Sequence, residues 1–379
     1  MKNTLRLLVP FWKKKAEQNI SARQLSEKVE QLGQRLEWLE REQLLALGVL
    51  GSMSEAVIAV DSSQKVLLVN SATERLFGIQ QQKIKGKNFL EAIRNSPLNE
   101  IALKTLRENR PQLEEMEMLT PIARFFRVHT APLAQQGRIA GVVMVLYDMT
   151  QLKQLEQVRK EFVANVSHEL KTPLTSIQAS VETLLDGAIN DSRNNRKFLE
   201  CIQQDAVRLG RLIEDLLQLS RIESKEVPLK KEEIALESFI QKAVEHFQKV
   251  LGEKKLSLTL KLETKSLTGD SEQLQRAVEN LLDNAIKYNQ EGGNIGILAK
   301  KEENWTRIEI EDTGVGIPQG DLPRIFERFY RVDKARSREL GGTGLGLSIV
   351  KHIAERHGGR VEVTSQLDKG SRFSLIIPA

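Results

Sequence analysis

The sequence of 379 residues predicts a multidomain chain that combines all-α with α+β segments. Its length suggests two to three domains. Apolar residues at spacings of three and four predict long amphipathic helices in 22–39 and 150–223, whereas short strands and helices alternate in the remaining parts. These patterns divide the chain into four segments, 1–48, 49–149, 150–226 and 227–379.

The first segment begins with a basic tip. Residues 1–28 hold seven Lys or Arg and two Glu, which accounts for the whole formal net charge of +5. The rest of the chain is therefore balanced, which argues against a nucleic-acid-binding body. The stretch "LRLLVPFWKKK" in residues 1–15 is suited to peripheral contact with an anionic membrane, with apolar side chains inserted and lysines at the headgroups. The alternative is an inert, frayed terminus.

Behind the tip, apolar residues recur in alternating steps of three and four, with charged residues and glutamines between them. They are Ala22, Leu25, Val29, Leu32, Leu36 and Leu39. This spacing predicts a short coiled-coil seam and hence a homodimer. The alternative is an amphipathic helix that packs on its own domain.

The lack of a long apolar run and the lack of a cysteine pair both bear on the cellular compartment. No apolar run approaches the ~18–20 residues that a membrane-spanning helix needs. The single cysteine, Cys201, permits no intrachain disulfide, which fits a reducing compartment. We therefore expect a cytoplasmic protein without a transmembrane helix.

Residues 49–149 predict a small α/β module. "EAVIAVDSSQKVLLVNSATERLFG" is typical of strand, turn, strand and short helix, and "ARFFRVHTAPLAQQGRIAGVVMVLYDMT" of a long hairpin. The placement of Asp61, Asn70 and the closing "YDMT" resembles a PAS domain, which implies signal input. No PAS cofactor is evident, because strand alternation makes His129 a surface residue and the module contains no cysteine.

Residues 150–186 and 193–223 predict two long helices joined at "DGAINDS". Each helix carries an apolar stripe, and two helices alone cannot bury both stripes. A pair of such hairpins can bury them as a four-helix bundle, so this segment also predicts a homodimer.

One histidine lies on the exposed side of the first of these helices. The apolar stripe of 163–184 defines the buried face, and His168 falls roughly 160° from its centre. Thr172 shares the exposed side, and Glu169 lies about a quarter-turn round, outside the stripe. Pro173 cannot donate to the carbonyl of Glu169, so we expect the helix to kink or loosen beside His168.

The string "SHELKTPL" around this histidine resembles the phospho-acceptor box of sensor histidine kinases. The resemblance implies that His168 receives a phosphoryl group from ATP. It further implies that Glu169 accepts a proton from the ring or orients it, and that Thr172 positions the water that dephosphorylates a response regulator. The alternative for a lone histidine is a solvated surface side chain.

Four strings in 227–379 point to a nucleotide site on an α/β sandwich. "GGTGLGLS" lacks the Lys-Ser/Thr ending of a P-loop but places glycines just before an amphipathic helix, whose amides suit phosphate oxygens. "NLLDNAIKY", "DTGVGI" and "FERFYRVD" precede it. In this order the four strings resemble the N, G1, F and G2 boxes of the ATP-binding domain shared by histidine kinases, gyrase, Hsp90 and MutL. The alternative, glycine turns without a ligand, has to explain all four strings.

Chemistry and resemblance together suggest individual roles. The carboxylate of Asp312 suits the exocyclic amine of adenine, where guanine would present a carbonyl. Asn284 offers an amide oxygen for Mg²⁺, and Lys287 and Arg331 can carry phosphate charge. Residues from about 331 to 343 are expected to form a mobile lid. The resemblance adds further nucleotide contacts at Asn280, Tyr288, Gly314, Gly316, Gly342, Thr343, Gly344, Leu345, Gly346 and Ser371.

Asn280 stands where gyrase-like ATPases carry the glutamate that activates water. An amide cannot take a proton, so its presence suits transfer to a protein side chain rather than to water. A stand-alone ATPase is thereby disfavoured, and the intact box around His168 disfavours a scaffold that binds ATP without transferring phosphate.

From the PAS-like module to its end, the chain most resembles the phosphate-regulon and cell-wall branch of PAS-containing sensor kinases. This implies a protein-histidine kinase that uses ATP and Mg²⁺. No receiver domain is visible in the sequence, so the aspartate of the response regulator must come in trans. Autophosphorylation within or between protomers both remain open. The chain departs from this branch at its front, where those proteins usually carry transmembrane helices.

Overall fold

The computed structural model describes residues 4–120, 122–135, 137–191, 193–223, 228–333 and 342–379. The side chains up to residue 27 are outside this description, and with them the predicted membrane contact of residues 1–15. The chain splits into two compact units, Met1–Val158 and Arg159–Ala379, which are described separately. Within the described residues, no helix is both long enough and apolar enough to cross a membrane.

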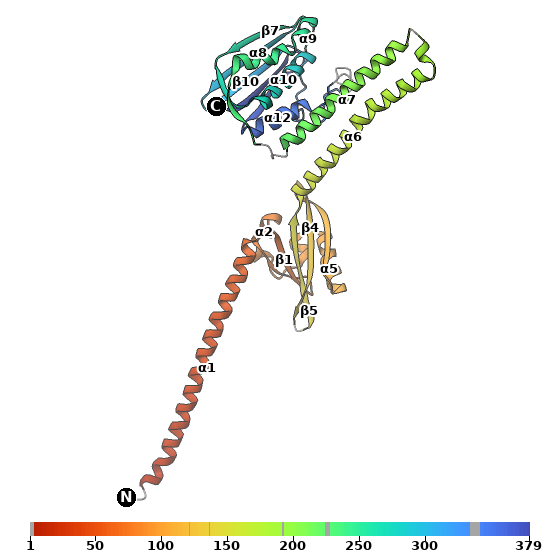
Figure 1. Ribbon diagram of the computed structural model, residues 1–379. Coiled ribbons are helices and arrows are strands. Elements are labelled where there is room, and N and C mark those ends of the chain that lie inside the picture. Colours follow the sequence, from red (N-terminus) through yellow and green to blue (C-terminus); the bar gives the residue numbers. More distant parts are fainter. Residues whose placement is uncertain (1–3, 121, 136, 192, 224–227, 334–341) are drawn as a thin grey trace. The chain divides into compact units, whose positions relative to one another are not determined.

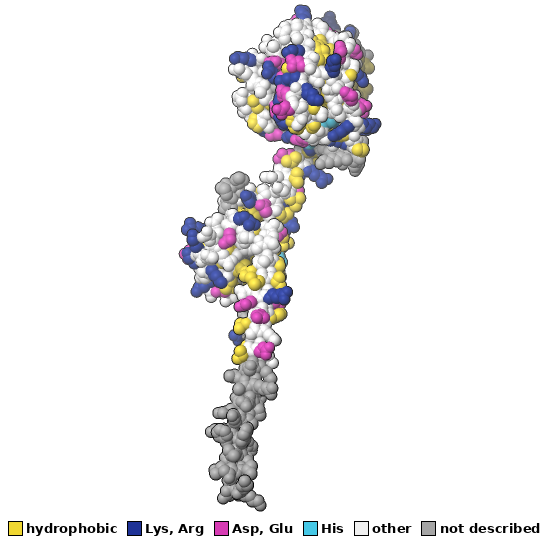
Figure 2. All heavy atoms as spheres, turned by 90° about the vertical axis from the view of Figure 1, so that its left-hand side faces the viewer, with side chains coloured by type: hydrophobic (Ala, Val, Ile, Leu, Met, Phe, Trp, Pro, Cys, Tyr) yellow, Lys and Arg dark blue, Asp and Glu magenta, His cyan; other side chains and the backbone are white. Residues whose placement is uncertain are grey.

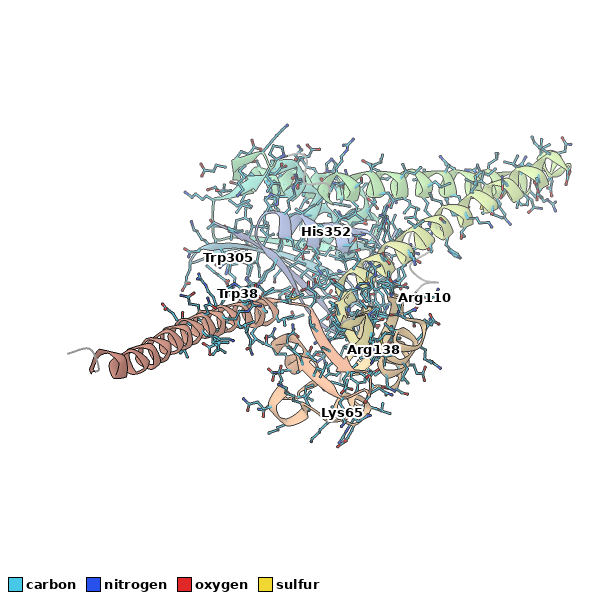
Figure 3. The ribbon with its side chains drawn as sticks, turned by 90° about the horizontal axis from the view of Figure 1, so that it is seen from below. Trp38, Lys65, Arg110, Arg138, Trp305 and His352 are labelled. Atoms are coloured by element: carbon cyan, nitrogen blue, oxygen red, sulfur yellow. The ribbon has the colours of Figure 1, made fainter. Side chains whose placement is uncertain are left out.

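The first unit begins with one continuous helix, α1 (Thr4–Ser52). The described members of the predicted seam are all strongly exposed, from 48% for Leu39 to 64% for Val29. Trp38, labelled in Figure 3, is also half-exposed on this helix. An apolar stripe of this length without cover in the single chain is what a coiled-coil partner would bury.

A five-stranded antiparallel sheet forms the body of this unit, in the order β2-β1-β5-β4-β3. Its strands are β1 (Ala56–Asp61), β2 (Val66–Val69), β3 (Gln112–Thr120), β4 (Ile122–Gln135) and β5 (Arg138–Asp148). The helices between β2 and β3 are α2 (Ser71–Phe77), α3 (Gln81–Ile84), α4 (Phe89–Ile93) and α5 (Ser96–Glu108). The predicted strand, turn, strand, helix order and the long hairpin are confirmed, whereas β3 was not anticipated. Helix α5 packs on the sheet, and Phe89, Leu98 and Met144 are fully buried in the core. His129 is exposed, as strand alternation predicted.

Asn70 joins the end of α1 to the sheet. Its amide nitrogen donates to the carbonyls of Leu50 (3.1 Å) and Glu55 (2.8 Å). Its amide oxygen accepts from the backbone N–H groups of Val57 and Thr73, both at 3.0 Å. The side chain is buried, and every polar atom of its amide is used, which explains why this position needs an amide.

The chain leaves the sheet through a second joint, at the start of α6 (Thr150–Leu185). The Thr150 hydroxyl accepts from the N–H of Phe125 on β4 (3.0 Å), and the N–H of Met149 donates to the Phe125 carbonyl (2.7 Å). Asp148 accepts from the N–H of Thr150 (2.9 Å), which caps the helix. The first turn of α6 is therefore tied to β4.

In the second unit, α6 continues into an antiparallel pair with α7 (Asn195–Glu223), joined through a 3₁₀ turn at Ala188–Asn190 (Figure 1). The two predicted helices are confirmed. Helix α6 runs uninterrupted through Pro173, whose ring is buried. Missing one backbone hydrogen bond is therefore tolerated without ending the helix.

The remainder of this unit is a sandwich of helices on a sheet. The five-stranded sheet has the order β11-β12-β10-β9-β7, with β7 parallel to β9 and the other pairs antiparallel. Helices α8, α10 and α12 share a core with it (Figure 1). The strands of this sheet are β7 (Ser257–Leu262), β9 (Asn294–Glu302), β10 (Trp305–Asp312), β11 (Arg360–Gln366) and β12 (Gly370–Pro378). Two further strands, β6 (Lys231–Ala235) and β8 (Ser266–Asp270), form a separate antiparallel pair. The helices are α8 (Leu236–Glu245), α9 (Gln248–Glu253), α10 (Ser271–Lys287) and α12 (Gly346–Arg356).

The predicted α/β sandwich is thus confirmed, including its two late strands. The C-terminal end of α7 packs into the same core, because Leu212, Leu219 and Ile222 are buried there. On the face of this sandwich in Figure 2, acidic and basic side chains are interspersed, in keeping with the balanced charge of this part of the sequence.

Candidate functional site

His168 is exposed on α6, as the helical periodicity predicted. The hydroxyl of Thr172, one turn later, donates to the His168 carbonyl at 3.0 Å and is also exposed. The apolar stripe beside them is only partly covered, since Val163 and Leu174 remain exposed in the single chain. The imidazole is therefore presented to solvent from a helix whose opposite side requires a partner.

Glu169 differs from its expected position outside the buried face. Its side chain is 16% exposed, and one carboxylate oxygen lies 3.1 Å from Arg208 on α7 and 3.1 Å from Arg331. Arg331 belongs to the sandwich, 162 residues further along the chain. A contact over such a distance has no local sequence signal, so the helical wheel placed Glu169 correctly on α6 but missed what covers it.

Asp312, at the end of β10, carries the buried carboxylate of the predicted adenine site. Burial raises its pKa, although hydrogen bonds from the N–H groups of Gly314 (2.8 Å) and Ser371 act in the opposite direction. The Ser371 hydroxyl pairs with that of Ser365 at 2.9 Å, so Ser371 reaches this site through its backbone. The acceptor of the site is thus held rigidly by main-chain donors.

Two glycines allow the chain to pass close to other backbone here. A Cβ atom at Gly314 would lie 2.3 Å from the Tyr288 carbonyl oxygen. Gly344 has φ +75°, and a Cβ there would lie 2.9 Å from the Cα of Phe329. A side chain at either position would force the backbone apart, which accounts for the two glycine-rich strings without reference to a ligand.

The three residues predicted to contact phosphate or metal differ in the hydrogen bonds and ion pairs that their side chains make. Lys287 is paired with Asp283 at 2.5 Å. The half-buried amide of Asn284 makes no side-chain hydrogen bond to the described residues, so its oxygen is available to a cation. The buried Nε of Arg331 likewise has no partner among the described residues. An unsatisfied buried guanidinium nitrogen fits a missing anionic ligand.

The last glycine-rich string precedes α12. Thr343 donates to the carboxylate of Asp215 on α7 (2.8 Å) and accepts from the N–H of Leu345 (3.3 Å). Leu345 is buried, and Gly346 opens the helix, so the first amides of α12 are available at this end as expected. Gly342 lies just before them, whereas residues 334–341 of the predicted lid lie outside the described residues.

Asn280 faces this string from α10. A Cβ atom at Gly346 would lie 2.8 Å from the Asn280 amide oxygen, and the amide nitrogen donates to the Arg276 carbonyl at 2.9 Å. Gly316, with φ +66°, belongs to the other glycine string, which follows β10. The predicted nucleotide residues therefore come mainly from α10, the end of β10 and the start of α12, with Ser371 on β12 and Arg331 in the segment between β10 and α12.

Sequence reasoning missed the contribution of α7. Arg208 and Asp215 contact Glu169 and Thr343, respectively, and they are seven residues apart. Seven residues are nearly two whole turns, so both side chains project from the same face of α7. This spacing of polar residues on an otherwise amphipathic helix is the one signal that could have identified them.

One compact unit contains both the exposed imidazole of His168 and a site suited to an adenine nucleotide. The buried acceptor of Asp312, the amides at the start of α12 and the Nε of Arg331, which has no partner among the described residues, suit adenine and phosphate. The free amide of Asn284 suits Mg²⁺ carried by the phosphates. The residues present therefore fit Mg·ATP.

Comparison with known proteins gives three family matches along the chain. Residues 48–149 match the PAS fold, 158–225 the His Kinase A (phospho-acceptor) domain, and 269–379 the histidine kinase-, DNA gyrase B- and HSP90-like ATPase. These are the three modules that the sequence patterns indicated, in the same order.

Among curated proteins, the chain is similar to a sensor protein kinase WalK of Staphylococcus aureus, with 34% identity over 337 residues, 87% of this chain and 80% of that protein. It is also 34% identical to the sensor histidine kinase WalK of Bacillus subtilis (strain 168), over 353 residues and 89% of this chain. The chain spans about half the length of other curated relatives, 56% of the Bacillus subtilis protein and 54% of WalK from Staphylococcus aureus strain Newman. One solved structure, histidine kinase ThkA in complex with response regulator protein TrrA, is 22% identical and has a TM-score of 0.49. The match covers 87% of this chain and 97% of that one.

Proposed function

Because this chain belongs to the PAS-containing sensor histidine kinases of two-component systems, we propose that it transfers the γ-phosphoryl group of ATP to His168. The observation that carries the proposal is the exposed imidazole on α6, in the same compact unit as an adenine-type site. An acceptor that has to meet a separate nucleotide domain must be presented to solvent, and His168 is.

In the transfer, an imidazole nitrogen attacks the γ-phosphorus as the bond to the β,γ-bridging oxygen breaks. A P–N bond forms, ADP leaves, and the ring proton passes to a base, for which Glu169 is the neighbouring candidate. The absence of a carboxylate at Asn280 supports transfer to protein rather than to water. Mg²⁺, when bound, would neutralise phosphate charge, and Asn284 would hold it.

The partners follow from chemistry as well as from the family. The phosphoramidate is labile enough to pass to an aspartate on a separate response regulator. The exposed stripes of α1, α6 and α7 favour a homodimer, whose four-helix bundle would bury them. Thr172 lies one turn from His168 and could position the water that dephosphorylates the regulator. We place the protein in the cytoplasm, with residues 1–15 at an anionic membrane surface.

Incubation of the purified full chain with Mg·ATP labelled at the γ-phosphate tests the proposal. We expect acid-labile, alkali-stable phosphate on the wild type. We expect none on His168→Ala, which should bind ATP as the wild type does, since the imidazole lies outside the nucleotide site. Label that persists in His168→Ala, or wild type that only releases inorganic phosphate, would contradict the assignment.

The same preparation tests Thr172 with a phosphorylated receiver domain added. Thr172→Ala should lower the rate of regulator dephosphorylation while leaving His168 labelling within about twofold, because among the described residues the hydroxyl bonds to a helix carbonyl alone. Thr172→Ser, which keeps the hydroxyl, is the matched control. An unchanged dephosphorylation rate in Thr172→Ala would remove the role.

A further inference from the structure

Two groups assigned to the nucleotide, Arg331 and Thr343, are already engaged by carboxylates of the phospho-acceptor hairpin. Arg331 contacts Glu169 on α6, and Thr343 donates to Asp215 on α7. Phe329 of the sandwich also contacts Phe162 of α6, with the two rings tilted by 41° and their centroids 5.9 Å apart. The two modules thus meet through the groups that a nucleotide would need.

The contact at Glu169 involves two cations of different origin. Arg208 and Glu169 lie on the same helical hairpin, so their pair does not depend on a residue of the sandwich. Arg331 comes from the sandwich, and its side chain is only 6% exposed. Glu169 is one carboxylate shared by two guanidinium groups, and the buried Nε of Arg331 has no partner among the described residues. A phosphate could therefore outcompete a carboxylate that Arg331 already shares.

The contact at Asp215 is a single hydrogen bond on a half-buried carboxylate. Burial raises the pKa of Asp215, against the effects of the Thr343 hydroxyl and of Arg276 and Lys287; Glu214 beside it adds to the rise. The carboxylate is therefore held in a place that is unfavourable for its charge, and it anchors the residue just before α12.

We propose that Glu169 and Asp215 form a releasable two-point clasp on the nucleotide site, with Arg208 and Asp215 as positioning residues. The inference rests on the proposed function, because it takes Arg331 and Thr343 as nucleotide contacts. When ATP binds, its terminal phosphate takes Arg331, and Glu169 remains on its own hairpin, paired with Arg208 beside His168. ADP lacks that phosphate and competes for Arg331 less. The carboxylate next to the acceptor is then freed from the sandwich only when a transferable phosphoryl group is present.

The clasp predicts opposite effects for its two positioning residues. Asp215→Ala removes one anchor of the docked arrangement, so nucleotide binding no longer has to break it, and affinity should rise about 3- to 10-fold. Arg208→Gln leaves Arg331 as the one cation paired with Glu169 in the described part of the chain, so releasing Arg331 would strand a largely buried carboxylate. Affinity for the triphosphate should then fall, by about 3- to 10-fold.

The measurement is calorimetric titration of the full chain with Mg·AMP-PNP and, separately, with Mg·ADP. Arg208→Gln should weaken AMP-PNP more than ADP, whereas a merely structural defect would weaken both equally. Glu200→Ala is the matched control, because this carboxylate on α7 pairs with Arg196 within the helix. It should leave both affinities unchanged. If Asp215→Ala unfolds, Asp215→Asn keeps the shape and accepts from Thr343 without a charge, so the hydrogen bond is weaker and binding should tighten by less.

Equal affinities in wild type, Asp215→Ala and Arg208→Gln would overturn the clasp, as would a loss of affinity in both variants. The proposed function would be untouched as long as the wild type still acquires label on His168. Conversely, wild type that binds nucleotide without labelling His168 would refute the kinase assignment. The clasp would then still be tested by the nucleotide affinities of the variants.

Discussion

The carboxylate of Asp312 accepts from two backbone N–H groups and is 7% exposed. Burial raises its pKa, so its charged form is disfavoured in the folded chain relative to the unfolded chain. Because the pKa of Asp312 is higher in the folded chain, the free energy of unfolding falls as pH rises from the unfolded-state pKa through the folded-state pKa. Below the unfolded-state pKa the carboxyl is neutral in both states and costs no stability. A buried carboxylate that costs stability is expected at a binding site rather than in a structural core.

Asp312→Asn should therefore stabilise the sandwich at neutral pH while impairing its site. The amide oxygen can still accept from Gly314, and no charge is buried, so we expect a gain of about 1 kcal/mol in the free energy of unfolding. The gain should shrink on acidification, because the wild-type carboxyl then becomes neutral. ATP affinity should fall roughly 10- to 100-fold, since an anionic acceptor for the adenine amine is lost.

Thermal melts at pH 5 and pH 8, together with calorimetric titration of ATP, check both effects. Glu311→Gln is the control, because this neighbour is exposed and pairs with Arg372 on the surface. A variant that loses stability at neutral pH, or that binds ATP as the wild type does, would show that Asp312 serves the fold instead.

Among the elements, α1 ends in a joint rather than a flexible linker. The amide nitrogen of Asn70 donates to the carbonyls of Leu50 and Glu55, and its amide oxygen accepts from one backbone N–H of β1 and one of α2. The last turn of α1 is therefore part of the hydrogen-bond network of β1 and α2. A displacement of α1 would therefore disturb the hydrogen bonds that Asn70 makes with β1, the first strand of the PAS module.

Asn70→Ala should destabilise this joint by about 2–4 kcal/mol, since it removes several hydrogen bonds and leaves buried groups unsatisfied. Hydrogen exchange should rise at the amides of Val57 and Thr73, which lose their acceptor. Asn88→Ala is the control, because the Asn88 side chain caps the exposed start of α4 through Leu90 alone. It should cost about 1 kcal/mol and leave Val57 protected. Exchange at Val57 that does not change in Asn70→Ala would rule the joint out.

At the scale of the molecule, the single chain leaves apolar faces of three helices uncovered. The exposed side chains include Leu36 on α1, Val163 and Leu174 on α6, and Leu217 on α7. Their number exceeds what scattered surface hydrophobics account for, and they lie at helical spacing. The assembly that covers them is expected to be the homodimer.

Replacing two exposed apolar residues of α6 with charged ones should therefore dissociate the dimer without unfolding the sandwich. We expect Val181→Glu with Leu185→Glu to shift the mass measured by light scattering from dimer toward monomer. ATP binding should persist, because the nucleotide site lies within one chain. Val250→Glu, an exposed apolar residue of α9, is the control and should remain dimeric. A wild type that is monomeric at micromolar concentration would contradict the assignment.

Local patterns predicted much of this molecule, and long-range contacts account for what they missed. The exposure of His168, the hairpin of β4 and β5 and the α/β sandwich all follow from periodicities of a few residues. The strand β3 was missed because "QLEEMEMLT" is rich in glutamate and becomes a strand by pairing with β4. The partners of Glu169 lie 39 and 162 residues away, so no local pattern could reveal them.

Helix α6 has a further consequence, which follows from counting along it. Thr150, tied to β4, and His168 are eighteen residues apart, which is five whole turns at 3.6 residues a turn. On an ideal helix these two positions of α6 therefore lie on the same side. Deleting one residue between them would turn the imidazole by about 100° around the helix axis relative to Thr150, whereas deleting seven would nearly restore its original direction.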